Sequence, residues 1–219
     1  MLVPPRSTKP ELLDQAPPAD AVLARNLHEM AILYRLTGGF RLGWRLLEPL
    51  IQPRCTILDV AAGDASLSRM IQRRSGANVI ACDLDSSVSM IAARAGMTVV
   101  QADGCQLPFA DATFDLVHCC QALHHFEPEH AVHLLQEIVR VARHGAVLVD
   151  LERSWLGYAG AWLTTRLPMF TPLARHDGAL SVLKAYTLAE VRDLAQRANV
   201  RIRQTVRNGI YWGISISKA

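Results

Sequence analysis

The chain has 219 residues, of which 50% are apolar and 20% charged, and its formal net charge is +3. This length and balance suit one globular α/β domain and exclude a disordered chain, and the scattered basic residues argue against a nucleic-acid-binding surface. The five cysteines form no C-x-x-C pair, so we expect a reduced, cytoplasmic protein without disulfides or bound metal. We find neither a signal peptide nor an apolar run long enough to span a membrane.

The N-terminal part of the chain is expected to lie outside the main domain. Residues 1–18 are rich in proline and predict a loose arm. Helical periodicity then runs from Ala19 to about Leu50 and is broken at Gly38-Gly39. We therefore assign residues 1–52 to an arm and a helical cap, and residues 53–219 to a single domain.

Strands and helices alternate after the cap. Short apolar strands are predicted at 56–60, 78–82, 98–101, 114–120 and 146–150, with helices at 67–74, 88–95 and 128–142. Asp85 or Ser86 is expected to cap the second of these helices, and His144-Gly145 to end the third. This alternation predicts a Rossmann-like, mostly parallel sheet with helices on both faces.

The C-terminal third departs from that rhythm. Residues 151–186 are rich in Trp, Leu, Pro and Gly, and we interpret them as a lid over a site. Thr187 and Glu190 form a capping-box pattern that opens a further helix. Two final strands joined at Asn208-Gly209 predict a hairpin, so the seven-stranded sheet should end with an antiparallel strand.

Acidic residues follow three of the predicted strands, where an open parallel sheet binds its ligands. Asp59 and Asp64 flank the first turn, Asp83 ends the second strand, and Asp103 follows the third. Asp83 suits a ribose diol, and Asp103 could accept from an exocyclic amine. Caps and turns would also explain Asp85 and Asp103, and we favour that explanation for Asp85, whereas we favour ligand contact for Asp83.

Four stretches, in this order, resemble the motifs of class I S-adenosylmethionine-dependent methyltransferases of the ubiquinone/menaquinone ("type 11") group. They are ILDVAAGDA at 57–65, VIACDLD at 79–85, QADGCQLPFADATFDLV at 101–117 and RVARHGAVL at 140–148. The family's first motif usually carries three glycines, and Ala61 and Ala65 replace the outer two here. We expect the turn to tolerate them if their φ angles are negative.

The resemblance implies S-adenosylmethionine as cofactor, S-adenosylhomocysteine as product, and a set of contacts. Asp59 would orient the methionine end, and Ala61, Ala62 and Gly63 would cradle it. Asp83, with Leu84 beside it, would bind the ribose, while Asp103 and Gly104 would meet the adenine. Cys119, Cys120 and Gln121 would line the sulfonium. The segments 35–39 and 175–181 also resemble bacterial enzymes associated with secondary-metabolite genes, in which Arg35 would reach the methionine carboxylate.

Three histidines are candidates for the base that a hydroxyl acceptor requires. His124 and His125 follow the fourth strand, and His176 precedes Asp177 in the lid, although a plain turn also explains that pair. His118 lies within a strand and is expected to be a core residue. Trp155, Trp162 and Phe170 would either line an apolar acceptor pocket or pack the lid onto the sheet.

The sequence therefore predicts methyl transfer to a small, largely apolar acceptor, aromatic or polyketide-like and most simply methylated at a hydroxyl oxygen. Methylation at carbon or nitrogen, and cofactor binding without catalysis, remain alternatives. A dinucleotide-dependent oxidoreductase is disfavoured because residues 61–66 lack a G-x-G-x-x-G pattern.

Overall fold

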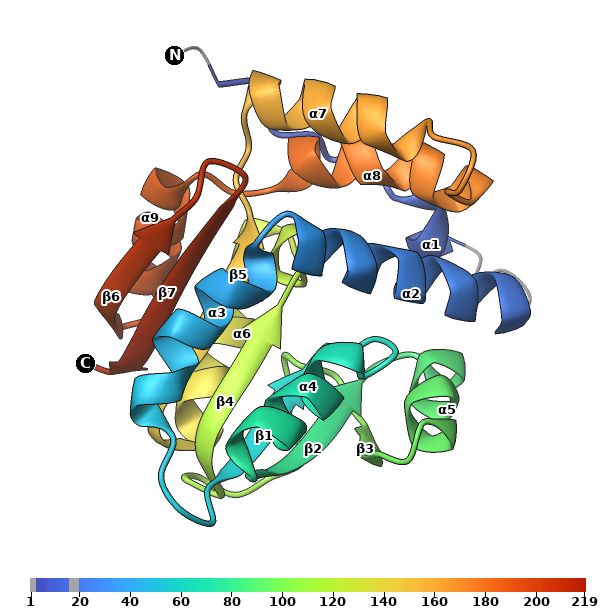
Figure 1. The fold of residues 1–219 in the computed structure, drawn as a ribbon. Helices are drawn as coiled ribbons and strands as arrows, with labels where there is room; N and C mark the ends of the chain where they lie inside the picture. The colour runs from blue at the N-terminus through green and yellow to red at the C-terminus, as the bar shows by residue number, and fades with distance from the viewer. Residues whose placement is uncertain (1–2, 16–19) are drawn as a thin grey trace.

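The fold is a seven-stranded sheet between two layers of helices, with further helices across one end of the sheet (Figure 1). The computed structural model describes residues 3–15 and 20–219. The strand order is β3-β2-β1-β4-β5-β7-β6. The strands are β1 (Thr56–Val60), β2 (Asn78–Asp83), β3 (Thr98–Gln101), β4 (Phe114–Cys120), β5 (Ala142–Leu151), β6 (Val200–Arg207) and β7 (Tyr211–Lys218).

The predicted sheet topology is confirmed. Adjacent strands from β3 to β5 run parallel, whereas β7 is antiparallel to both β5 and β6. Asn208 accepts hydrogen bonds from the amides of Ile210 and Tyr211 in the turn that joins the last two strands. The carboxyl ends of the parallel strands therefore meet at one edge, which is where the candidate residues gather.

Two hydrophobic cores sandwich the sheet. One lies under α6 (Pro128–Val141) and α9 (Leu188–Arg197), and the other under α3 (Gly39–Leu47) and α4 (Ser66–Ser75). Helix α5 (Ser86–Arg94) packs beside β2 and β3. Asp85 caps α5 by accepting from the amides of Ser87 and Val88, and Thr187 and Glu190 form the predicted capping box of α9.

One predicted boundary is wrong. Helix α6 ends at Val141 and β5 begins at Ala142, so His144 and Gly145 lie inside the strand instead of ending the helix. The pairing of β5 with β4 shifts register between Phe114 and Leu116, as expected of a bulge. Gly145 has a φ of 142°, and a side chain there would meet the carbonyl oxygen of Ile216 at 2.6 Å. A glycine at position 145 therefore allows neighbouring strands to pack closely.

One of the N-terminal helices lies across the carboxyl edge of the sheet. Helix α2 (Asp20–Leu36) crosses that edge, and α3 continues from it after Gly38, whose φ is 86° (Figure 1). The prediction of a loose arm is wrong for the described residues 3–13, while residues 1–2 and 16–18 lie outside the described part. The Ser7 amide donates to the Leu183 carbonyl, and the Arg6 guanidinium donates to the carbonyls of Lys184 and Phe126.

The expected lid consists of two antiparallel helices, α7 (Trp155–Thr165) and α8 (Pro172–Lys184). We call residues 155–184 the lid hairpin. Helix α8 packs against α2 and against the short helix η2 (Leu123–His125), and α7 is the outermost layer (Figure 1). No helix in residues 3–15 and 20–219 has the length and apolar character needed to cross a membrane.

Candidate active site

The turn after β1 is built from residues in the left-handed region. Ala61, Gly63 and Ala65 have φ angles of 54°, 59° and 55°. The condition under which we expected the turn to tolerate the two alanines, a negative φ angle at each, is therefore not met. A Cβ atom makes this conformation unfavourable by roughly 1–2 kcal/mol per residue, so the turn holds strain that glycine would relieve. A side chain at position 63 would meet only Leu27 of α2, at 3.9 Å.

Asp83 joins this turn to the end of β2. One carboxylate oxygen accepts from the Gly63 amide at 3.0 Å, and the other accepts from the Asp85 amide at 3.2 Å. Burial raises the pKa of Asp83, although these amide bonds partly oppose the rise. A carboxylate oxygen can accept more than one hydrogen bond, so the group retains capacity for ribose hydroxyls.

The residues expected at the adenine lie beside Asp83. Asp103 is exposed and accepts from the Cys105 amide at 2.8 Å, so it has a turn-forming role. A side chain on Gly104 would come within 2.9 Å of Leu134, which explains that glycine by packing alone. Leu84 is 64% exposed, leaving an apolar surface that a ring would cover. The structure thus brings Asp83, Leu84 and Asp103 to one edge.

The Asp59 side chain points into the protein interior. It is 2% exposed, and its carboxylate accepts from the Ser68 hydroxyl and pairs with His118 Nδ1 at 2.7 Å. His118 is therefore a satisfied core histidine, as expected from its place inside a strand. The structure does not bring Asp59 to the strand-end edge, because both carboxylate oxygens serve contacts inside the protein.

The end of β4 contributes an unpaired polar group. The Nε2 atom of Gln121 is buried and has no hydrogen-bond partner among the described residues. Gln121 itself has a φ of 56°, which marks the sharp turn out of the strand. Burial raises the pKa of Cys119 and of Cys120 well above the usual range, so both thiols stay protonated and are poor nucleophiles.

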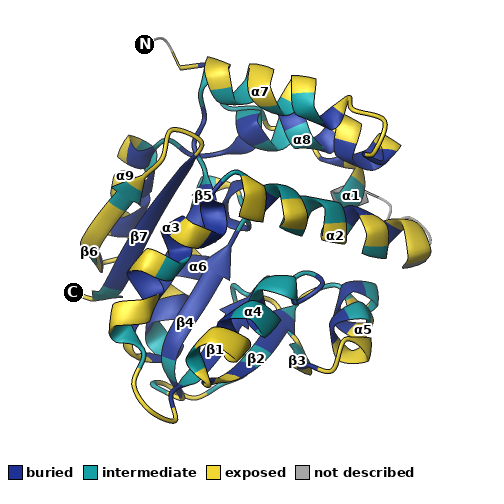
Figure 2. Ribbon diagram, in the orientation of Figure 1, coloured by how far each residue is buried: buried dark blue, intermediate teal, exposed yellow. Residues whose placement is uncertain are grey.

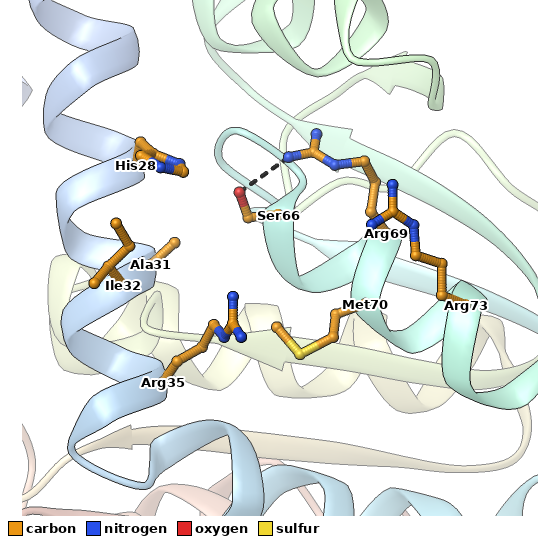
Figure 3. Close-up of a pocket in the computed structure, with 8 residues that line it drawn as sticks. All are labelled: His28, Ala31, Ile32, Arg35, Ser66, Arg69, Met70 and Arg73. Carbon is orange, nitrogen blue, oxygen red and sulfur yellow. Dashed lines mark hydrogen bonds between the residues drawn. The ribbon is translucent and has the colours of Figure 1, made fainter.

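Arg35 lies in a different place from the strand-end residues. It lines a cavity of about 270 Å³ between α2 and α4, together with His28, Ala31, Ile32, Ser66, Arg69, Met70 and Arg73 (Figure 3). Its side chain points toward Met70. The cavity that Arg35 lines includes neither Asp83 nor Asp103.

A buried histidine–aspartate pair stands where β4 and β5 end. His124 Nδ1 lies 2.8 Å from one oxygen of Asp150, and the His124 amide donates to the other oxygen at 2.9 Å. The two residues are 3% and 1% exposed. Burial alone would lower the pKa of His124, but the charge and hydrogen bond of Asp150, aided by Glu11, raise it above the usual value.

Glu11 of the N-terminal arm faces this pair. Its carboxylate lies 3.9 Å from His124 Nε2, 3.9 Å from His125 Nδ1 and 3.6 Å from the Lys184 ammonium. Glu11, His124 and His125 present ligand atoms within 4.8 Å of one another, the spacing of a potential metal site among the described residues. The Lys184 cation already offsets the carboxylate, so the cluster is also explained without a metal.

The lid residues are arranged differently from the prediction. His176 is half-exposed on α8 and its Nδ1 lies 2.7 Å from Asp177, so the pair belongs to a helix and not to a turn. Asp177 accepts from the amides of Leu12 and Leu13, which fastens the arm. No described contact joins His176 to His124.

The two lid tryptophans are partly exposed. Trp155 and Trp162 are 54% and 43% exposed, whereas Phe170 is buried. Helix α7, which carries both tryptophans, packs on α8, so their predicted packing onto the sheet is wrong, whereas their role in an acceptor pocket stays a prediction.

Two residues of the site were missed by the sequence. Asp150 is the last residue of the strand predicted at 146–150, but the sequence does not pair it with His124, which is 26 positions earlier. The strand order could have suggested the pair, because β4 and β5 are neighbours in this topology. Glu11 carried no such signal, because it lies in a proline-rich arm without periodicity.

The strand-end edge fits S-adenosylmethionine on two observations. The turn at Ala61–Gly63 lets a ligand approach the backbone, and the buried Gln121 amide requires an acceptor. Asp83 would bind the ribose, Asp103 and Leu84 would lie by the adenine, and Gln121 would face the methionine end. The residues therefore suit the cofactor, with Asp59 and Arg35 excepted.

Comparisons with known proteins agree with this geometry. Residues 57–145 match a family described as "Methyltransferase domain". A demethylmenaquinone methyltransferase of Thermobifida fusca is 41% identical over 107 residues, covering 46% of this chain and 44% of that protein. The matched region thus spans less than half of that relative. An uncharacterized methyltransferase of Synechocystis sp. is 35% identical over 173 residues, covering 76% of this chain and 74% of that protein.

Solved structures share the fold. A SAM-dependent methyltransferase from Aquifex aeolicus has a TM-score of 0.62 at 17% identity, covering 88% of this chain and 97% of that one. Human N-acetylserotonin methyltransferase, solved with SAM, has a TM-score of 0.64 at 15% identity, covering 92% of this chain and 57% of that one. From the cyanobacterial relative and the shared fold, this chain belongs to the class I S-adenosylmethionine-dependent methyltransferases.

Proposed function

We propose that this protein methylates a hydroxyl oxygen of a small, largely apolar acceptor, with S-adenosylmethionine as methyl donor. The observation that carries the proposal is the buried His124–Asp150 pair at the ends of β4 and β5. The relatives named demethylmenaquinone methyltransferases support an acceptor of this broad class.

His124 is the proposed general base. When bound, S-adenosylmethionine supplies an electrophilic methyl group, and the protein must align the acceptor oxygen and remove its proton. Asp150 fixes the ring of His124 and accepts from Nδ1–H, which leaves the Nε2 lone pair available. His124 Nε2 then takes the hydroxyl proton, and Asp150 stabilises the imidazolium that results.

The N-terminal arm must move for this step. A hydroxyl donating to His124 has to come within about 3 Å of Nε2. Glu11 now approaches that atom to 3.9 Å and is itself 3% exposed. An acceptor hydroxyl that reaches Nε2 must therefore replace Glu11 beside the histidine.

The proposal is tested by measuring S-adenosylhomocysteine formation with a panel of phenols and hydroquinones. Replacing His124 with Asn should lower the single-turnover rate by about 10²–10⁴-fold, the usual contribution of a general base. The matched variant His176→Asn should leave the rate within about twofold, because His176 is half-exposed and apart from the pair. Mass spectrometry of the product identifies the methylated atom.

Two results would contradict the proposal. If His176→Asn or His125→Asn abolished turnover while His124→Asn did not, the assignment of the base would be wrong. If the protein bound the cofactor in calorimetry but methylated no acceptor, the alternative of a cofactor-binding protein without catalysis would be favoured. Near-ultraviolet circular dichroism checks that each variant keeps its packed core.

A further inference from the structure

Helix α7 exposes its large apolar side chains, the reverse of an ordinary surface helix. Its small residues face the protein: Thr165 is 0% exposed against Gly178 of α8, and a side chain at Gly157 would meet Val182 at 3.4 Å. Its large apolar residues face outward, with Leu156 at 80% and Leu163 at 67% exposed. Surface helices normally bury the apolar stripe and expose polar residues.

Large exposed apolar side chains gather on this outer face and on the turn that follows α7. The members of this cluster are at least 43% exposed: Trp155, Leu156, Trp162, Leu163, Leu167 and Met169. The sequence of α7, WLGYAGAWLTT, contains no charged residue. Figure 2 shows α7 as largely exposed, at the edge of the molecule farthest from the sheet. Single exposed apolar residues are common, but a cluster of this kind marks a binding surface.

The exposed charged residues of the lid hairpin have one sign. Arg166 and Arg175 are exposed, and the Arg166 guanidinium lies 3.7 Å from the centroid of the Trp162 ring. Asp177 is the only acidic residue between 154 and 184, and it is buried against the arm. An apolar face with tryptophans and a basic rim matches the interface of an anionic bilayer.

A second copy of the chain fits this face less well. A two-fold interface between identical α7 helices would bring the Arg166 side chains of both copies to the same contact, with no exposed acid on the lid hairpin to offset them. The helix has 11 residues, or about 16 Å at 1.5 Å per residue, which is too short to cross a bilayer. It suits a helix that lies in the plane of the interface.

We propose that the lid hairpin docks on an anionic lipid bilayer, with the outer face of α7 inserted among the acyl chains and Arg166 and Arg175 at the phosphates. The inference stands independently of the acceptor, since it rests on the exposed face alone. It also gives the lid a role, because the hairpin covers η2 and His124 and would adjoin the phase in which apolar molecules dissolve.

The test is cosedimentation with vesicles of phosphatidylcholine alone or mixed with phosphatidylglycerol. Wild-type protein should pellet with the anionic vesicles and much less with the neutral ones, and added salt should weaken binding. The variant L156E/L163E should lower the partition coefficient about tenfold or more. Leu36→Glu is the matched control, because Leu36 is 78% exposed on α2, and it should bind like wild type.

Fluorescence gives a second readout. Trp155 and Trp162 should shift to shorter wavelength on binding, whereas Trp212 is already 0% exposed. The proposal is overturned if wild-type protein stays in the supernatant with both vesicles, or if L156E/L163E and Leu36→Glu lose binding equally. It is also overturned if the outer face mediates dimers instead, seen as a wild-type dimer that L156E/L163E converts to a monomer without any vesicle binding. Since both leucines are exposed, the double variant should keep the wild-type melting temperature.

Discussion

The left-handed alanine at position 61 can be tested against its neighbour. Ala61 has a φ of 54°, whereas Ala62 is not among the residues with positive φ, and both are half-buried. Glycine at position 61 relieves strain at the cost of a more flexible unfolded chain and a lost methyl contact. Glycine at position 62 brings the same two costs but relieves no strain. The difference in stability between the two variants therefore isolates the free energy of the left-handed backbone conformation.

The magnitudes follow from general values. Replacing a left-handed alanine with glycine removes a conformational penalty of about 1–2 kcal/mol from the folded state. The unfolded-state entropy of glycine costs about 0.4–1 kcal/mol. Half of a buried methyl group costs about 0.4 kcal/mol. Ala61→Gly should therefore be neutral to stabilising, by about 0.4 kcal/mol, and Ala62→Gly should destabilise by about 1.1 kcal/mol.

Thermal unfolding measures the difference. At about 2–4 °C per kcal/mol for a chain of this size, the two variants should differ by roughly 3–6 °C in melting temperature. Urea titration at a fixed temperature should give the same order. If Ala61→Gly and Ala62→Gly lowered stability equally, the turn would not hold the strain that its φ angle implies.

The other predictions concern the lid, the base and the cofactor. Gly178→Ala should destabilise the protein by about 1–3 kcal/mol, because the added methyl group would meet Thr165 at 2.7 Å. Gly160→Ala should stabilise it by about 0.5–1 kcal/mol, because a methyl group there meets nothing within 4 Å, and chemical denaturation compares the two variants. The folded-state pKa of His124 is raised, so the protonated histidine stabilises the fold below about pH 6.5, and this stabilisation is lost as the pH rises through the folded-state pKa. The melting temperature should therefore fall with rising pH more in the wild-type protein than in His124→Asn. Asp83→Ala should raise the dissociation constant for S-adenosylmethionine by about 10–100-fold in calorimetry, and unchanged affinity would refute its role.

Local patterns predicted the sheet well. The strands at 98–101 and 114–120, the cap at Asp85, the capping box at Thr187 and the hairpin at Asn208 all match the structure. Each depends on neighbouring residues, through apolar runs or short side-chain bonds to the backbone. The boundary at Val141 failed because the tight pairing of β5 draws residues into the strand that their own propensities assign to a turn.

Long-range contacts limited the prediction of the site. Asp83 could be assigned from its place after a strand, but the inward turn of Asp59 depends on Ser68 and His118, which only the packed fold brings together. The contact of Glu11 with His124 joins residues more than 100 positions apart. The division at residue 52 and the acceptor remain predictions.

The bond from the Gly63 amide to Asp83 has a spectroscopic consequence. This N–H belongs to a half-exposed loop, yet it donates to a largely desolvated carboxylate at 3.0 Å. Its proton should resonate well downfield of other loop amides and exchange slowly with deuterium. Because Asp83 is also the expected ribose ligand, the amide resonance of Gly63 would report cofactor occupancy in the heteronuclear spectrum of an isotope-labelled protein, without a chemically attached probe.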